Sequence, residues 1–201
     1  LILGSESFKN AELKGNTGDG SSITYELTGG ATMANTNSNR YFRWTTVGAY
    51  VAKGVTLCLS VMYKPVSGAD EFCMEIAYTA GYSTSQSWAT IKPTDQLEIE
   101  QTDGWVLRYG LWTPPDNATL KLVDMGSGTT HAGTGNYTNK FSLLHPMLQY
   151  GNAPTAWNAS SGDYLTQESA KSLFSQTADE IKTEVTKSVT ETVTANVKDT
   201  A

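Results

Sequence analysis

Hydrophobic and polar residues alternate with a period of two through most of residues 1–164. This pattern recurs in short segments, each ending in turn-forming residues such as Gly, Pro, Asn or Asp. The segments are 21–27, 41–47, 55–63, 71–78, 95–101, 105–112, 118–125 and 140–150. Because strand side chains alternate between two faces, the pattern predicts an all-β domain, an antiparallel β-sandwich of the jelly-roll kind.

The pattern changes after residue 164. Residues 165–201 contain neither Gly nor Pro, and apolar residues recur there at intervals of three or four positions. The apolar positions are Ala170, Phe174, Ala178, Ile181, Val185, Val189, Val193 and Val197. One apolar stripe cannot form a core alone, so it predicts a C-terminal α-helical, coiled-coil extension that self-associates. Beyond about residue 185 the valines would also share one face of a strand, and both interpretations remain open there.

Two domains are therefore expected, a β-sandwich over 1–164 and a helical stalk over 165–201. The chain opens on Leu1 rather than on Met, which favours a fragment of a longer protein. The formal net charge of -6 disfavours nucleic acid and anionic membranes as partners, because neither attracts an acidic surface. No apolar run approaches the length of a membrane span, so membrane insertion is not expected.

The two cysteines lie in the neighbouring segments 55–63 and 71–78, which we expect to form a hairpin. In a regular hairpin Cys58 and Cys73 would point to opposite faces and could not form a disulfide without a bulge. We expect two reduced, buried thiols that act as small core residues rather than as redox or metal-binding groups.

Residues for catalysis are sparse. The two histidines, His131 and His145, occur in different contexts, and the common motifs for metal, nucleophile and phosphate chemistry are absent. The acidic segment 95–103 contains Glu98 and Glu100, which would share one face of a strand without a facing carboxylate. A solvated sheet face is therefore favoured over glycoside hydrolysis, and we expect no enzyme activity.

Sugar recognition needs flat aromatic faces and planar polar groups, and the chain has five Trp and ten Tyr. Tyr82 and Trp88 are the leading candidates, because they flank a polar stretch that packing alone does not explain. The full set of candidate glycan-binding residues is Trp88, Tyr82, Trp44, Tyr41, Arg43, Trp112 and Tyr137. Arg40 and Arg108 could also donate bidentate hydrogen bonds to sugar hydroxyls. For each aromatic residue the alternative is packing within the sandwich.

The two ends of the predicted sandwich carry a recognisable pattern. It starts "LILGSESF" and ends "FSLLHPMLQYGNAPTAWNASSGDY", and an internal strand carries Trp105 and Arg108. This pattern resembles the jelly-roll, carbohydrate-binding-module-like domains of bacteriophage and prophage tail and baseplate proteins. The final strand of those domains bears a Leu-Glu-x-Gly motif, a short spacer, a Trp turn and an acid. The matching positions here are Leu148, Gln149, Gly151, Trp157 and Asp163. Gln149 stands where Glu is usual, and His145-Pro146 stands where an Asp-Asn type dipeptide is common.

The resemblance implies a non-catalytic tail module, in the virion tail or otherwise extracellular, that binds a host-surface glycan. It implies a homotrimer through 165–201 and other tail proteins as partners. No cofactor is required, although similar modules hold a structural calcium near their joined termini, where Glu6 and Asp163 are the candidate ligands. Trp157 is expected to plug the open end of the core rather than to contact sugar.

Two alternatives remain open. The sandwich could be a structural spacer without a ligand, or the accessory domain of a larger cell-wall or polysaccharide hydrolase. An exposed aromatic platform separates a glycan-binding module from a spacer, because a spacer should hide its aromatic residues.

Overall fold

The structure is a computed structural model that describes residues 8, 11–15, 20–26, 30–46, 48–128 and 137–157. Within this part of the chain twelve strands form two antiparallel sheets. The strands are β1 (Glu12–Gly15), β2 (Ser22–Tyr25), β3 (Ala31–Ser38), β4 (Arg40–Thr45), β5 (Tyr50–Val51), β6 (Leu57–Gly68), β7 (Phe72–Ala80), β8 (Gln86–Ile91), β9 (Leu97–Glu100), β10 (Val106–Trp112), β11 (Ala118–Ser127) and β12 (Tyr137–Tyr150). The predicted all-β class with antiparallel sheets is confirmed.

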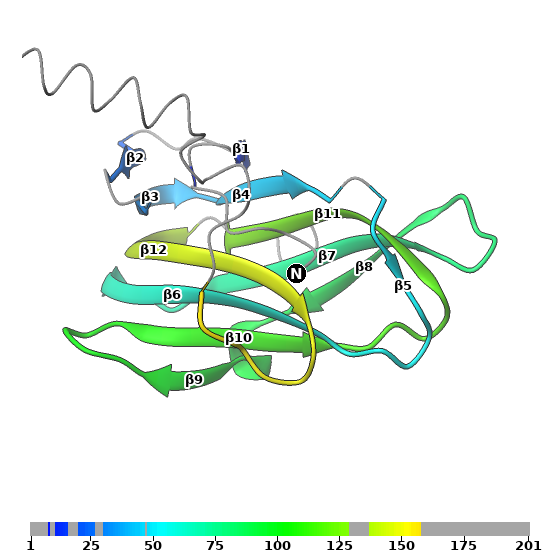
Figure 1. Cartoon of the computed structure of the whole chain (residues 1–201). Helices are drawn as coiled ribbons and strands as arrows, with labels where there is room; N and C mark the ends of the chain where they lie inside the picture. Colours follow the sequence, from blue (N-terminus) through cyan, green and yellow to red (C-terminus); the bar gives the residue numbers. More distant parts are fainter. Residues whose placement is uncertain are drawn as a thin grey trace, which may run out of the picture. The chain divides into compact units, whose positions relative to one another are not determined.

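The two sheets lie face to face, as Figure 1 shows for β12, β6 and β10 against β11, β7 and β8. The first sheet has the order β1-β4-β11-β7-β8, with β5 also paired to β11, and we call it the β11 sheet. The second has the order β2-β3-β12-β6-β10-β9, and we call it the β12 sheet. The predicted helix over 165–201, His131 and the candidate calcium ligands Glu6 and Asp163 lie outside the described residues. No helix in the described part is long and apolar enough to cross a membrane.

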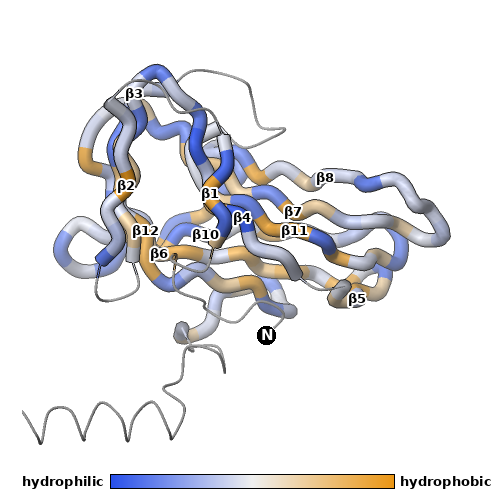
Figure 2. The backbone as a smooth tube through the Cα atoms, turned by 90° about the horizontal axis from the view of Figure 1, so that it is seen from above, coloured by the Kyte–Doolittle hydropathy of each residue, from blue (hydrophilic) through white to orange (hydrophobic). Residues whose placement is uncertain are grey.

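The core lies between the sheets because alternate residues of both sheets are apolar. In Figure 2 apolar and polar stretches alternate along β7 and β11. Phe42, Met74, Leu59 and Leu143 are fully buried. Aromatic rings of the two sheets meet in this layer, with the ring centroids of Phe72 and Phe141 5.7 Å apart in an edge-to-face arrangement. Burial of this apolar surface is the main favourable term in folding.

Strand β3 was not predicted, since its sequence ATMANTNS is polar and reads as a loop. Two of its polar residues, Asn35 and Ser38, are instead buried inside the sandwich. Asn35 is 3% exposed, and its side-chain amide donates a 2.9 Å hydrogen bond to Asn139 Oδ1 of β12. A buried amide that finds such a partner costs little, so a polar segment can run as a paired strand.

The predicted hairpin between 55–63 and 71–78 is wrong. Strand β6 belongs to the β12 sheet and β7 to the β11 sheet, so the chain crosses between layers instead of folding back. Cys58 and Cys73 are nevertheless free and buried, as expected. Burial raises the pKa of the Cys58 thiol to about 11 and that of the Cys73 thiol to about 12, so both are inert at neutral pH.

Arg108 stabilises this crossing. Its guanidinium donates to Asp70 Oδ1 at 2.9 Å, in the β6–β7 connection, and to Glu98 Oε1 at 2.8 Å, in β9. Its central carbon also lies 3.9 Å from the ring centroid of Tyr63. Arg108 is only 5% exposed, which corrects its place among the sugar-binding candidates. Glu98 is correspondingly an ion-pair partner rather than part of a freely solvated face.

Candidate functional site

Three of the predicted ligand residues come together on the outer face of the β11 sheet. Alternation along β4 places Phe42 and Trp44 in the core, so Tyr41 and Arg43 face outward. The guanidinium carbon of Arg43 lies 5.4 Å from the Tyr41 ring centroid and 5.6 Å from that of Trp88, on β8. We call Tyr41, Arg43, Glu75, Trp88 and Asp124 the Arg43 cluster.

The Arg43 cluster is built on an ion pair at its centre. Arg43 donates from Nε to Asp124 Oδ1 at 2.8 Å and from Nη2 to Asp124 Oδ2 at 2.7 Å. This side-chain hydrogen bonding raises the pKa of Arg43 above its ordinary value. Glu75 accepts a 2.9 Å hydrogen bond from Thr90, and the Glu75 and Asp124 side chains are fully buried. A bidentate pair over buried carboxylates is a structural arrangement, because removing the arginine would leave a buried charge without its counter-ion.

The other predicted residues do not join this cluster. Trp44 is 2% exposed and packs in the core, which removes it from the ligand candidates. Trp112 packs on the core residue Tyr78, with ring centroids 4.6 Å apart. Tyr137 is half-buried at the start of β12. Tyr82 is fully exposed in the turn between β7 and β8, and Trp88 lies within β8, which begins at Gln86 inside the polar stretch.

The outer face of the β12 sheet carries a different site, which begins at an irregularity in β12. Leu144 pairs with Met62 of β6, but the next pairing is Met147 with Ser60. His145 and Pro146 therefore form a bulge, and His145 has a φ of 57°. A positive φ is uncommon for a residue other than Gly, and such strain is often found at functional positions.

The segment 151–157, which we call the return segment, folds back beside this bulge. Gln149 fixes it with both ends of its side-chain amide. Its Nε2 donates to the Ala153 carbonyl at 2.8 Å, and its Oε1 accepts from the Thr155 hydroxyl at 2.7 Å. Gln149 is 5% exposed, so these bonds satisfy a buried amide that could not be left unpaired without cost.

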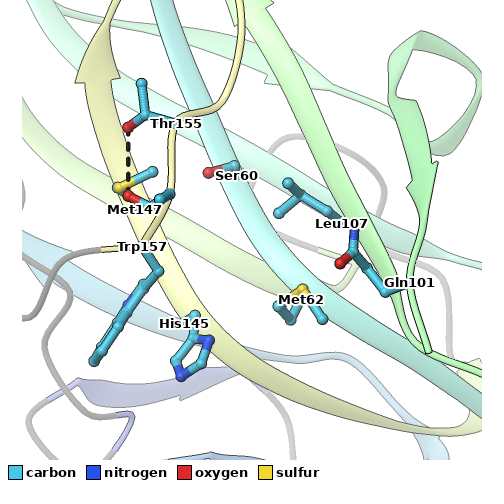
Figure 3. Close-up of a pocket in the computed structure, with 9 residues that line it drawn as sticks. Ser60, Met62, Gln101, Leu107, His145, Met147, Thr155 and Trp157 are labelled. Carbon is cyan, nitrogen blue, oxygen red and sulfur yellow. Dashed lines mark hydrogen bonds between the residues drawn. The ribbon is translucent and has the colours of Figure 1, made fainter. Parts of the chain in front are cut away.

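The return segment places Trp157 against His145. The two rings are stacked, with centroids 4.1 Å apart and an interplanar angle of 28°. Trp157 does not plug the core as expected, since it is 39% exposed on the outer side of the β12 sheet. The stacked rings border a pocket of about 300 Å³ (Figure 3), which we call the Trp157 pocket. Its lining residues are Ser60, Met62, Gln101, Leu107, His145, Met147, Thr155, Ala156 and Trp157.

The Trp157 pocket is neutral and partly apolar, and one polar group in its lining lacks a hydrogen-bond partner among the described residues. None of its lining residues is an acid, a lysine or an arginine, and burial lowers the pKa of His145, which favours its neutral imidazole. The Ser60 side chain is 1% exposed, and its hydroxyl has no hydrogen-bond partner among the described residues. A buried hydroxyl without a partner is costly, and here it borders an open pocket.

Sequence reasoning missed this pocket, although one signal was present. The His-Pro step interrupts an apolar run within a predicted strand, and a Pro inside a strand suggests a bulge. No metal site is evident in this region either, since the described residues hold no group of three or more His, Cys, Asp or Glu suited to an ion. The calcium expectation at Glu6 and Asp163 stays a prediction.

No family model and no curated protein matches the chain. Among solved structures, the enzymatically active domain of bacteriophage CBA120 tailspike protein 4 has a TM-score of 0.45 and 11% identity over 72% of this chain. The CBM22-1 and GH10 modules of Clostridium thermocellum xylanase 10B, complexed with xylohexaose, have a TM-score of 0.47 and 14% identity over 74% of this chain. A family 16 carbohydrate-binding module has a TM-score of 0.43 and 15% identity over 74%. This chain spans 20%, 28% and 99% of those three chains, respectively. At these scores the matches assign no ligand to this chain.

Proposed function

We propose that the sandwich is a non-catalytic module that binds a neutral glycan in the Trp157 pocket. The observation that carries the proposal is the exposed Trp157–His145 stack beside a pocket of about 300 Å³ that holds the unpartnered Ser60 hydroxyl. An aromatic wall suits the C–H face of a sugar, and a buried hydroxyl suits its polar substituents. Pockets that combine apolar walls with few polar groups are typical ligand sites.

Exposed aromatic residues favour this function over a spacer. Tyr82 is fully exposed, Tyr50 is 58% exposed and Tyr150 is 48% exposed, in addition to Trp157. A spacer has no need to expose large rings to water, since burying them would add stability. The Arg43 cluster is the weaker candidate for the binding site, because its central guanidinium already engages a fully buried carboxylate.

The experiment is a glycan array probed with the chain and with two tryptophan variants. Trp157→Ala removes the aromatic wall, and truncation of a central aromatic contact costs about 2 kcal/mol or more, roughly 30-fold in affinity. Trp105→Ala is the matched control, because Trp105 is also partly accessible to solvent but does not line the pocket. Glycan binding should be lost in the first variant and kept in the second. Equal binding by both variants, or no binding by the unmodified chain, would refute the proposal.

The sequence of residues 165–201 supports a second element of the function. Its apolar stripe and its resemblance to tail-protein connectors lead us to place this module in a phage or prophage tail, as a trimer in contact with other tail proteins. Three copies of a weak site raise overall affinity without new contacts. Light scattering on the full chain and on a chain ending at Tyr164 tests the oligomer. The full chain should be trimeric and the shortened chain monomeric, and a monomer in both cases would contradict trimerisation.

A further inference from the structure

The base of the Trp157 pocket is apolar. Met62 of β6, Leu107 of β10 and Met147 of β12 contribute side chains to its lining, and Figure 3 shows them facing the same space. Hydroxyl groups placed against thioether and alkyl groups would lose hydrogen bonds to water without replacement. A sugar that presents only hydroxyls therefore fits this surface poorly, and a ligand that carries a methyl group fits it well.

Polar groups lie beside this apolar surface. The Ser60 hydroxyl lies on β6, two residues from Met62 and paired with Met147 of β12, and the imidazole of His145 lies on another side of the pocket. Gln101 lies across the pocket from the stacked rings (Figure 3). Its Nε2 donates to the Ile99 carbonyl at 3.3 Å, so its other side-chain atom, an amide oxygen, is an acceptor. The ligand must therefore offer both an acceptor and a donor close to its methyl group.

The size of the pocket limits the ligand further. Its volume of about 300 Å³ lies at the lower end of the range of small-molecule pockets, about 300–1,000 Å³. This is room for a single sugar residue with one substituent, and the stacked Trp157 and His145 rings provide the wall for the sugar ring. A charged substituent is disfavoured, because the lining contains no counter-charge.

We infer that the Trp157 pocket recognises a 2-acetamido sugar, an inference that rests on the proposed glycan function. An acetamido group is neutral and combines a methyl group, a carbonyl acceptor and an N–H donor. The methyl group contacts Met62, Leu107 and Met147, and the carbonyl accepts the hydrogen bond that the Ser60 hydroxyl lacks. The N–H donates to the acceptor that Gln101 provides.

The test follows the indole N–H signals of the full-length chain by two-dimensional NMR during titration with N-acetylglucosamine and, separately, with glucose. N-acetylglucosamine should shift one indole signal, assigned to Trp157 by its absence in Trp157→Ala. Glucose should require at least about tenfold higher concentration for the same shift, because it lacks the methyl group and the amide.

Ser60→Ala tests the polar contact. Loss of one hydrogen bond of about 0.5–1.5 kcal/mol should weaken N-acetylglucosamine binding by about two- to twelvefold. The variant should fold at least as stably as the unmodified chain, because it removes a buried hydroxyl that has no partner in the described structure. Ser67→Ala is the matched control, since Ser67 is exposed on the same strand and does not line the pocket; it should leave affinity unchanged.

The outcomes separate the inference from the proposed function. Equal affinity for glucose and N-acetylglucosamine, with the Trp157 signal shifting in both titrations, overturns the acetamido inference and leaves the glycan site in place. Unchanged affinity in Ser60→Ala overturns the assigned hydrogen bond and with it the inference. Absence of any Trp157 shift with either sugar, together with a negative glycan array, overturns both.

Discussion

The substitution Gln149→Glu tests how the Trp157 pocket is held together. Gln149 uses its amide as both donor and acceptor, to the Ala153 carbonyl and from the Thr155 hydroxyl. A glutamate at this position keeps the shape of the side chain and can still accept from Thr155. At neutral pH it has no proton to donate to Ala153, and it places a negative charge beside that carbonyl oxygen.

The magnitude follows from burial and hydrogen bonding. Loss of the hydrogen bond to Ala153 lowers the free energy of unfolding by about 0.5–1.5 kcal/mol. The buried carboxylate, left with a single hydrogen-bond donor, lowers it by about 1–3 kcal/mol more. Because Gln149 is only 5% exposed, solvent relieves little of this cost. We expect a total loss of about 2–4 kcal/mol at pH 7, unless the return segment detaches to hydrate the charge. Detachment would lower the loss of global stability but would separate Trp157 from His145.

Two measurements together detect a loss of global stability and a detachment of the return segment. Urea unfolding gives the change in free energy, and tryptophan fluorescence reports whether Trp157 leaves its stack. Burial raises the pKa of the introduced carboxyl above its unfolded value of about 4.3. Stability relative to the unmodified chain should therefore recover as the pH falls through that raised pKa, because the protonated carboxyl can again donate to Ala153.

Gln86→Glu is the control, since it adds the same charge at an exposed position on the other sheet. It should change the free energy of unfolding by no more than about 0.5 kcal/mol. The reasoning fails if Gln149→Glu matches this control in both unfolding and fluorescence at pH 7. It also fails if the loss caused by Gln149→Glu grows instead of shrinking on acidification.

Three further predictions concern other buried groups. Because the pKa of His145 is lowered in the folded chain, the unfolded chain binds the proton at a higher pH, so the free energy of unfolding should fall as the pH drops below 6.5. Urea unfolding curves should show a weaker fall in His145→Asn, a variant chosen because Asn tolerates a positive φ. The double variant Asp70→Asn with Glu98→Gln should lose about 1–3 kcal/mol in urea unfolding, because it leaves the buried Arg108 without a counter-ion while solvent screens the two partly exposed carboxylates, and no measurable loss would contradict this. Gly126→Ala should lose about 1–3 kcal/mol and lower the melting temperature, since its methyl group would overlap the backbone of β4; an unchanged melting temperature would show that β4 can move away.

Periodicity predicted much of the fold because it reports which face of a strand is buried. The segments 55–63 and 71–78 were correctly identified as strands, but their pairing was not. Alternation is the same for strands that pair in one sheet and for strands that face each other across the core. The crossing between the layers is seen in the pairing of the folded strands, where β6 pairs with β12 and β7 pairs with β11. Such long-range contacts leave no mark on local sequence.

The inward packing of two candidate ligand residues was not predicted, for a different reason. Trp44 was a candidate because it follows a polar run, and Trp112 because it precedes the Pro-Pro turn, yet both rings pack against the core. Trp157 was assigned to packing because it follows the last strand, yet its ring remains partly exposed. Residue type alone does not separate a core aromatic residue from a ligand-binding one, since both offer the same flat apolar surface.

Three residues of β12 explain where the candidate site lies. His145 and Pro146 form the bulge that brings an imidazole to the pocket. The third residue is Gln149, whose amide donates to the Ala153 carbonyl, which a carboxylate could not do. The pocket of this chain therefore depends on His145, Pro146 and Gln149. Strand periodicity alone does not assign this role to any of the three residues, so the ligand specificity of the pocket must be measured on this chain.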